Sequence, residues 1–523
     1  MGTAAIQREH PAVNPWLIAV SVMLGTFMEV LDTTIVNVSL QHIAGNLGAT
    51  VDEATWVLTS YLVANAIILP MTGWLANRFG RKRILMLSIG GFTVSSVMCG
   101  LAPNLPTLLF FRILQGASGG GLQPLSQAIM LEAFPPEKRG RAMAFWGLGI
   151  VVAPMLGPVL GGWITDSYTW RWLFYINLPV GLLGLLMSQV FVFDPPYIQR
   201  LRGRVDYWGL GLLAVGMGAL QIMLDKGQED DWFGSHFIVV LAIVAGVGLG
   251  VFVINELLRG HPIVNLRVFR IRTYATGVFL MTTLGFVLYG STVLIPIFLQ
   301  TLLGYSALNA GVAMLPRGLG SFIAMPVVGI LTAKIEPRKL LATGLSVAAL
   351  SLWMLSNINL NAGYWDIFWP QFIQGLSLGV IFVPLTTATH DPISKHEMGN
   401  ATSIFNVMRN IGGSVGIAAV TTIVARSTQR NINVLGGNVN PYNQSTRNML
   451  QGATSLFMNG GGGPPTAMNR AFGAVFGMVQ QQAAMLANIH AFRLLSLIFV
   501  CAIPLIFLMR RPRHHGGTEA AIH

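Results

Sequence analysis

The sequence is short of charged residues, of cysteine and of clustered histidine. Only 10% of its 523 residues are Asp, Glu, Lys or Arg, whereas about a quarter is usual in soluble domains. Cys99 and Cys501 each lie inside an apolar run, so neither a disulfide framework nor a cysteine metal site is expected. The ten histidines are scattered along the chain. The sequence shows no nucleophile, metal set or phosphate cradle, so we expect a protein that is not an enzyme and needs no cofactor.

Apolar residues make up 53% of the chain. They form runs of about 20 residues, the length that crosses the hydrocarbon core of a bilayer. We therefore predict an all-α polytopic membrane protein with fourteen transmembrane helices. Their predicted ranges are about 16–40, 54–76, 84–102, 107–133, 141–165, 170–194, 207–225, 236–258, 273–302, 309–332, 339–358, 366–390, 400–426 and 490–509.

The basic residues lie mostly in the short connections between these runs. The net charge of +12 therefore indicates membrane topology and not nucleic-acid binding. Most of the 32 Lys and Arg fall in alternate connections, which places those connections and both chain termini in the cytoplasm. We expect a multi-pass protein of the cytoplasmic (inner) membrane, with cytoplasmic tails at 1–15 and 511–523.

The two halves of the chain repeat each other. Residues Gly73–Leu85 match Gly329–Leu341, and the pair Gln115–Gly116 matches the pair Gln374–Gly375. Such repeats are typical of transporters whose halves rock around a central site. The predicted parts are an N-terminal six-helix bundle at 16–194, a linker with two extra transmembrane helices at 195–272, and a C-terminal six-helix bundle at 273–510.

The C-terminal bundle includes a long external loop at about 427–489, rich in Asn, Gln and Gly. Its first half has the composition of a flexible loop. From Thr466 to His490 the apolar residues recur at helical spacing, which predicts an amphipathic helix leading into the last span.

Two acids lie in the first apolar run. Glu29 and Asp32 are about one helical turn apart, so both side chains point to the same face. A carboxylate inside a bilayer costs at least a few kcal/mol, so it is kept with a partner, with water or with a proton to carry. Arg112 in the fourth helix is expected at a similar depth and in reach of Asp32. We predict that these three groups carry the coupling proton as one interacting set, the alternative being a static ion pair.

Arg409, Arg317 and Glu132 are further charged residues within predicted helices. Arg409, in the Gly-rich run of the thirteenth helix, is a weaker candidate for proton coupling or for a structural role, and Arg317 is weaker still. Glu132 lies near the cytoplasmic end of the fourth helix, where we expect it to be solvated.

Six stretches resemble the major facilitator superfamily and, within it, the fourteen-helix drug:proton antiporters of EmrB and QacA type, the EmrB-type multidrug exporters most of all. In chain order they are LDTTIVNV (Leu31–Val38), the basic loop Gly73–Arg83, FRILQG (Phe111–Gly116), APMLGPVLGG (Ala153–Gly162), WRWLFYINLPVG (Trp170–Gly181) and LQIMLDKGQEDDWF (Leu220–Phe233). The resemblance covers nearly the whole chain.

The resemblance implies roles for individual residues. Asp32, Thr34 and Asn37 occupy its motif positions in the first helix, and Gln115 is implied in the substrate cavity. The remaining implied positions are Gly73, Arg78, Gly80, Arg81 and Lys82 in the cytoplasmic loop motif, and Pro154, Gly157, Pro158, Gly161 and Gly162 in the gating motif of antiporters. The three glycines of the gating motif lack side chains, so we expect each to let the fifth helix approach a neighbour closely. The superfamily has an acid where this chain has Asn77, so the inter-bundle ion pair ascribed to that acid is not expected here.

The function implied is proton-coupled export of amphipathic, lipophilic toxic compounds by alternating access. The expected partners are lipophilic small molecules, protons and membrane lipids and, if the organism has two membranes, a periplasmic adaptor and an outer-membrane channel. Two alternatives stay open. One is a proton-coupled transporter of a single metabolite such as an amino acid, a sugar or a siderophore; the more distant one is a polytopic membrane enzyme or receptor.

Overall fold

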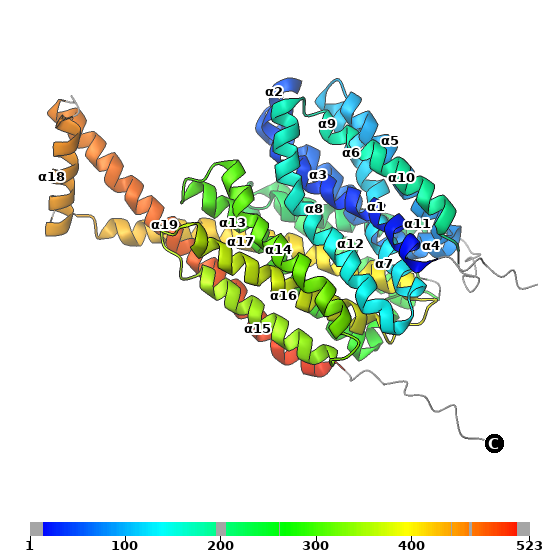
Figure 1. Ribbon diagram of the computed structural model, residues 1–523. Helices are drawn as coiled ribbons and strands as arrows, with labels where there is room; N and C mark the ends of the chain where they lie inside the picture. Colours follow the sequence, from blue (N-terminus) through cyan, green and yellow to red (C-terminus); the bar gives the residue numbers. More distant parts are fainter. Residues whose placement is uncertain (1–13, 195–204, 261, 441, 460–462, 510–523) are drawn as a thin grey trace, which may run out of the picture.

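The computed structural model describes residues 14–194, 205–260, 262–440, 442–459 and 463–509 (Figure 1). All regular secondary structure in these ranges is helical. Thirteen of the helices described there are long and apolar enough to cross a membrane. This confirms the predicted all-α polytopic fold. Most of the predicted N-terminal tail, the C-terminal tail and residues 195–204 of the linker lie outside the described residues.

The first half of the chain forms one group of helices (Figure 1). They are α1 (Pro15–Ile35), α2 (Leu40–Leu47), α3 (Val51–Ile68), α4 (Thr72–Phe79), α5 (Arg81–Leu101), α6 (Leu105–Gly119), α7 (Leu122–Ala133), α8 (Arg139–Ser167), α9 (Trp172–Tyr175) and α10 (Asn177–Phe191). Helix α1 packs against α7, α8 and α10, while α6 packs against α3 and α5. This places α1, with both buried acids, in the interior of the group.

The fourth predicted span is not one helix. It consists of α6 and α7, which are separated at Gly120 and Gly121. The reason is local, because Pro124 has no N–H to bond the Gly120 carbonyl oxygen one turn back, although Gly120 and Gly121 keep right-handed helical backbone angles. Gln123 lies in the first turn of α7, directly after this break.

Two further helices and a second group follow. Helices α11 (Tyr207–Lys226) and α12 (His236–Leu258) pack against each other, and α11 also contacts α3 and α17. The second group consists of α13 (Arg272–Thr301), α14 (Ala307–Leu331), α15 (Pro337–Leu355), α16 (Tyr364–His390), α17 (Met398–Gly437) and α19 (Pro464–Ala502). Its strongest packing is between α14 and α16 and between α13 and α17, which mirrors the first half.

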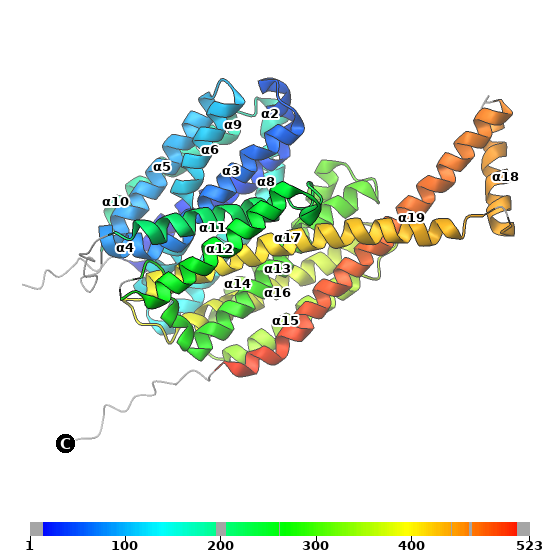
Figure 2. The same ribbon diagram turned by 180° about the vertical axis from the view of Figure 1, so that it is seen from behind.

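The expected flexible loop in the first half of 427–489 is wrong. Helix α17 continues to Gly437, α18 spans Gln444–Asn459, and α19 begins at Pro464. The C-terminal part of α17, all of α18 and the N-terminal part of α19 form an arm that projects beyond the two groups (Figures 1 and 2). The polar composition of this segment is typical of a loop. A helix, however, satisfies its own backbone hydrogen bonds and can form without an apolar core. The predicted helix from Thr466 to His490 is confirmed and is continuous with the last span, but part of its apolar face, including Phe472 and Phe476, is exposed.

The two halves meet at one end of the molecule, which we call the basic end because it holds the α4–α5, α7–α8 and α14–α15 connections. Gly73 of α4 lies against α17, so closely that a Cβ at Gly73 would lie 2.7 Å from the Asn400 Cα. Gly140 of α8 lies against α14, where a Cβ would be 2.8 Å from the Gly329 carbonyl oxygen. Glycine therefore permits backbone contact between the halves at two places on the basic end.

Candidate functional site

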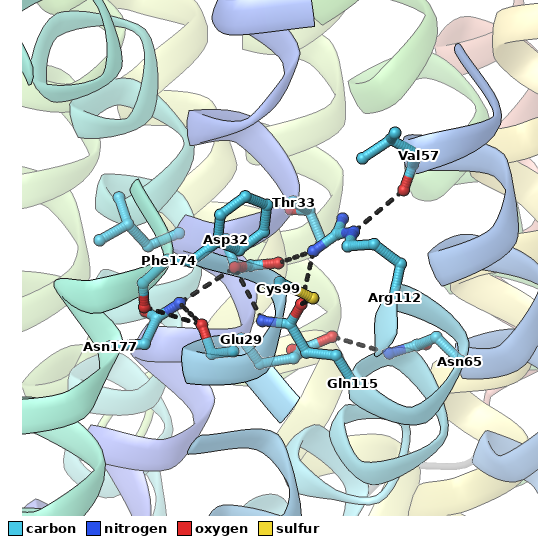
Figure 3. Close-up of polar contacts among 12 residues, drawn as sticks. Glu29, Asp32, Thr33, Val57, Asn65, Cys99, Arg112, Gln115, Phe174 and Asn177 are labelled. Carbon is cyan, nitrogen blue, oxygen red and sulfur yellow. Dashed lines mark hydrogen bonds and ion pairs between the residues drawn. The ribbon is translucent and has the colours of Figure 1, made fainter. Parts of the chain in front are cut away.

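Asp32 is completely buried and accepts three hydrogen bonds. Arg112 Nη1 lies 2.6 Å from Asp32 Oδ2, which forms a buried ion pair between α1 and α6. The side-chain amides of Gln115 and Asn177 each donate to Asp32 Oδ1 at 3.0 Å (Figure 3). The predicted pairing of Asp32 with Arg112 is thus confirmed. A buried pair of this kind holds only with such added hydrogen bonds, because both ions have lost their hydration.

The guanidinium group of Arg112 is held on several sides. Its Nε donates to the Val57 carbonyl oxygen of α3 at 2.9 Å, and its Nη1 also donates to Gln115 Oε1 at 2.8 Å (Figure 3). Its central carbon lies 4.2 Å from the centroid of the Tyr61 ring and 5.7 Å from that of Phe174. Aromatic faces attract cations most strongly where water is excluded, so the site fixes the position of this charge.

Glu29 lies beside this pair and is also buried, with 2% of its surface exposed. Asn65 of α3 donates to Glu29 Oε1 at 3.1 Å (Figure 3), and Gln123 of α7 donates to Glu29 Oε2 at 2.6 Å. Neither partner is a cation. Two carboxylates of one helix face therefore have different environments, one ion-paired and one held by neutral amides.

Gln123 connects Glu29 to the other half of the molecule. Its side-chain oxygen accepts a hydrogen bond from Arg409 of α17, while its nitrogen donates to Glu29. Arg409 is 1% exposed, and its Nε and Nη1 have no hydrogen-bond partner in the described part of the chain. One helical turn away, Asn406 donates to Gln127 Oε1 at 2.5 Å, again between α17 and α7. The acid of one half is thus joined to the arginine of the other through one amide.

Two of the motif residues in the first helix lie apart from the acids. Thr34 Oγ1 donates to the Leu31 carbonyl oxygen within α1 at 3.0 Å, and Asn37 is exposed beyond the end of the helix. The roles implied for these two residues remain predictions.

The gating motif lies on α8 where this helix crosses α1. A Cβ at Gly157 would overlap Thr34, and one at Gly161 would lie 2.7 Å from the Ile35 carbonyl oxygen. A Cβ at Gly162, by contrast, would meet nothing within 4 Å, so the expected close approach at that glycine is wrong. Pro154 and Pro158 lie inside α8. Two of the three glycines therefore bring α8 against α1, next to the acids.

The loop motif lies at the basic end. Arg81 is 1% exposed and forms an ion pair with Glu132 of α7, so the expectation that Glu132 is solvated is wrong. Gly80 has φ of 100°, a conformation that favours glycine. Lys82 Nζ donates to the Gln189 carbonyl oxygen at 2.6 Å, and Arg78 lies over the ring of Trp74. The motif therefore joins the start of α5 to α7 and α10.

The stretch Leu220–Phe233 attaches α11 to both halves. Asp225 accepts a hydrogen bond from Thr59 of α3, and Lys226 Nζ donates to Thr55 at 2.6 Å. On the other side, Trp232 Nε1 donates to Thr422 of α17 at 2.8 Å. The extra helix pair is therefore bonded to one helix of each half.

Sequence reasoning missed three members of the site, Asn65, Gln123 and Asn177. Only Asn177 had a signal, because it stands in the stretch Trp170–Gly181 that carried part of the resemblance. Asn65 had none beyond being an amide in an apolar run. Among the described residues, no group of three or more His, Cys, Asp or Glu could hold a metal ion.

Comparison with known proteins gives one family. The sequence profile of the Major Facilitator Superfamily matches residues 22–417. The multidrug export protein EmrB of Haemophilus influenzae is 43% identical over 429 residues, covering 82% of this chain and 84% of the relative. EmrB of Escherichia coli K12 is 36% identical over 530 residues, covering 99% and 100%. The fatty acid resistance protein FarB of Neisseria gonorrhoeae is 37% identical over 501 residues, covering 96% and 97%.

Solved structures share the fold at low sequence identity. The human organic anion transporter MFSD10 superposes with a TM-score of 0.61 at 13% identity, covering 95% of this chain and 100% of the other. The proton:xylose symporter XylE also gives a TM-score of 0.61, at 14% identity, covering 95% and 96%.

Proposed function

Because this chain belongs to the Major Facilitator Superfamily, we propose that it is a secondary transporter that exports amphipathic, lipophilic compounds in exchange for protons. The names of its relatives refer to multidrug export and to fatty acid resistance, which supports substrates of this character. The observation that carries the proposal is the buried, ion-paired Asp32 next to a second buried acid, Glu29, which the Gln123 amide joins to Arg409 of the opposite half.

The proton acts at the face of α1 that carries Asp32 and Glu29. A proton arriving from outside neutralises this face, weakens the pairing of Asp32 with Arg112 and displaces the substrate. Its loss to the cytoplasm restores the pair. Each charge moved across the membrane is worth about 2.3 kcal/mol per 100 mV, so one proton per cycle supports a gradient of roughly fifty-fold.

The amide of Gln123 converts protonation into movement of the halves. When Glu29 is charged, Gln123 donates to a carboxylate and accepts from the guanidinium group of Arg409. Both hydrogen bonds are then charge-assisted, and they favour contact between α7 and α17. A protonated Glu29 binds the Gln123 amide less strongly, so the contact with α17 weakens. The proton therefore alters the free-energy difference between the two arrangements of the halves.

The test is efflux of a fluorescent lipophilic dye from proteoliposomes with an imposed pH gradient. We expect the gradient to drive dye movement and Asp32→Asn to abolish it, while binding of the dye without a gradient persists. Asp166→Asn is the matched control, because Asp166 is an exposed acid on α8. It should transport like the unchanged protein.

Two results would redirect the proposal. Gradient-driven movement that survives in Asp32→Asn would move the proton site to Glu29 or elsewhere. A protein that moves no dye under any gradient would favour the transporter of one metabolite.

The placement in the cell is part of the proposal. The basic end, with Arg78, Arg81, Lys138 and Lys334 in or beside its connections, is proposed to face the cytoplasm with both termini, in the cytoplasmic membrane. The arm of α17, α18 and α19 then projects on the outer side.

In an organism with two membranes, the arm is proposed to contact a periplasmic adaptor that continues to an outer-membrane channel. Exposed apolar side chains on it support a protein partner, among them Tyr442, Leu456, Phe472 and Phe476, with 91%, 73%, 48% and 53% of their surface exposed. Removing the arm should abolish co-purification with an adaptor while insertion into the membrane persists. Unchanged co-purification would exclude the arm.

A further inference from the structure

Arg317 is a buried cation that lacks a counter-ion. It lies on α14 with 2% of its surface exposed, and no ion pair involves it in the described part of the chain. Its Nη1 donates to Thr292 Oγ1 at 3.1 Å, and its Nη2 lies 3.4 Å from Ser291 Oγ and 3.5 Å from the Leu288 carbonyl oxygen. Neutral oxygen atoms at these distances compensate a buried charge only weakly, since they carry no opposite charge.

The internal repeat identifies the equivalent place in the first half. Gly116 of α6 lies against the Tyr61 carbonyl oxygen of α3, and Gly375 of α16 lies against the Arg317 carbonyl oxygen of α14. Arg317 therefore occupies the position of Tyr61. The contact between α14 and α16 therefore repeats the contact between α3 and α6.

The hydrogen bonds around the two glutamines repeat as well. Gln115 donates to Asp32 of α1 at 3.0 Å, and Gln374 donates to Ser291 of α13 at 3.3 Å. Ser291 thus stands where the first half has Asp32. Three residues before each glutamine, the first half has Arg112 and the second half has Gln371.

The second site therefore keeps a cation and lacks the acid. In the first half, the charges of Asp32 and Arg112 cancel, whereas the second half has Arg317 with Ser291 and two neutral glutamines. Both side-chain atoms of the Gln371 amide and Gln374 Oε1 are buried without a hydrogen-bond partner in the described residues. Unpaired buried amides cost about 1–3 kcal/mol each, so the framework has one positive charge and several polar atoms to be satisfied.

We propose that Arg317, Ser291, Gln374 and Gln371 form a binding site for the carboxylate head of an amphipathic ligand. A carboxylate carries the single negative charge that is missing, and its two oxygens match the fork of a guanidinium group. The site lies among the membrane helices α13, α14 and α16, so the rest of the ligand is apolar.

Access to this site rests on the proposed transport cycle, whereas recognition of the head group does not. Helix α14 packs against α8 of the opposite half, so rocking of the halves moves the helix that carries Arg317. The ligand enters in an arrangement of the halves that exposes the guanidinium group.

The experiment compares ligands with one chain and different heads. Binding of dodecanoate, dodecyl phosphate and dodecyltrimethylammonium is measured by displacement of a bound dye in lipid nanodiscs at pH 8, without a proton gradient. In Arg317→Gln we expect the dodecanoate affinity to fall about tenfold or more, the effect of losing a charge-assisted hydrogen bond, and the affinity for the cation to stay unchanged. Arg317→Lys, which keeps the charge, should retain part of the dodecanoate affinity.

Ser291→Asp provides an independent test. It restores the missing acid from within the chain, so it should abolish selective binding of dodecanoate and raise the melting temperature. This variant decides the matter if Arg317→Gln does not fold.

Three outcomes would overturn the proposal. They are dodecanoate affinity unchanged in Arg317→Gln or in Ser291→Asp, equal loss of all three ligands from a folded variant, and a preference for dodecyl phosphate over dodecanoate. Because no gradient is used, failure here leaves the efflux test with Asp32→Asn unaffected.

Discussion

Replacing Gln123 with leucine should shift the equilibrium between the two arrangements of the halves. Leucine keeps a similar volume but removes the 2.6 Å hydrogen bond to Glu29 and the one accepted from Arg409. A hydrogen bond to a charged group contributes about 1.5–3 kcal/mol. If only the arrangement with the basic end closed makes the Arg409 contact, its population falls about 10- to 150-fold relative to the other.

Inter-bundle distances measure this shift directly. Spin labels at Phe79→Cys, beside the α4–α5 connection, and at His396→Cys, between α16 and α17, lie on opposite halves at exposed positions. Cys99→Ala and Cys501→Ser provide the background. Double electron–electron resonance at pH 8 should give a short distance in the parent protein and a larger share of a longer distance in Gln123→Leu.

Asn65→Leu is the matched control for this experiment. Asn65 also donates to Glu29, at 3.1 Å, but from α3 of the same half. Its loss changes the environment of the acid without breaking a bond between the halves, so the distance should stay short. If Gln123→Leu is folded and keeps the parent distance distribution, the amide does not hold the halves together and the coupling argument fails.

Three further results follow from the structure. Gly73→Val should lengthen the same spin-label distance, because even a Cβ at this position would lie 2.7 Å from the Asn400 Cα; an unchanged distance would mean that α17 adjusts locally. Glu132→Gln should lower the free energy of unfolding by about 3 kcal/mol, since it leaves the buried Arg81 without its ion pair; a melting temperature equal to that of the parent would contradict this. Replacing residues 434–479 with a short Gly/Ser linker should leave dye efflux from proteoliposomes intact, because Asn431 and Ala483 lie in contact at 3.2 Å and bring the cut ends together; loss of efflux from a folded variant would make the arm part of the transport unit.

The sequence was sufficient for the charged core of the site. Glu29 and Asp32 were identified because acids are costly in an apolar run, and the depth of Arg112 predicted its pairing with Asp32, which the 2.6 Å ion pair confirms. The repeat also predicted two matching groups of helices. The inferences about the charged residues were possible because burying a charge in a membrane costs so much free energy that such a residue stands out in a single sequence.

The neutral partners could not be ranked in the same way. An amide such as Gln123 costs less to bury than an acid, so nothing in the sequence separates it from Gln127 or from the amides of the arm. The break between α6 and α7 follows from the N–H that Pro124 lacks, which a search for apolar runs does not register. The helices in the first half of the arm were not predicted because their composition is polar, although they need little burial to form.

Helix α17 is a single rod of 40 residues that belongs both to the arm and to the site. From Arg409 to Gly437 it measures about 42 Å at 1.5 Å per residue. Its C-terminal part, α18 and the N-terminal part of α19 form the three sides of a triangle outside the helical groups (Figure 2). A force applied to α18 is therefore transmitted as a tilt of the whole rod, whose other end holds the arginine that meets Gln123. In this transporter, α17 therefore connects the arm mechanically to Arg409 and to its buried contact with Gln123 and Glu29.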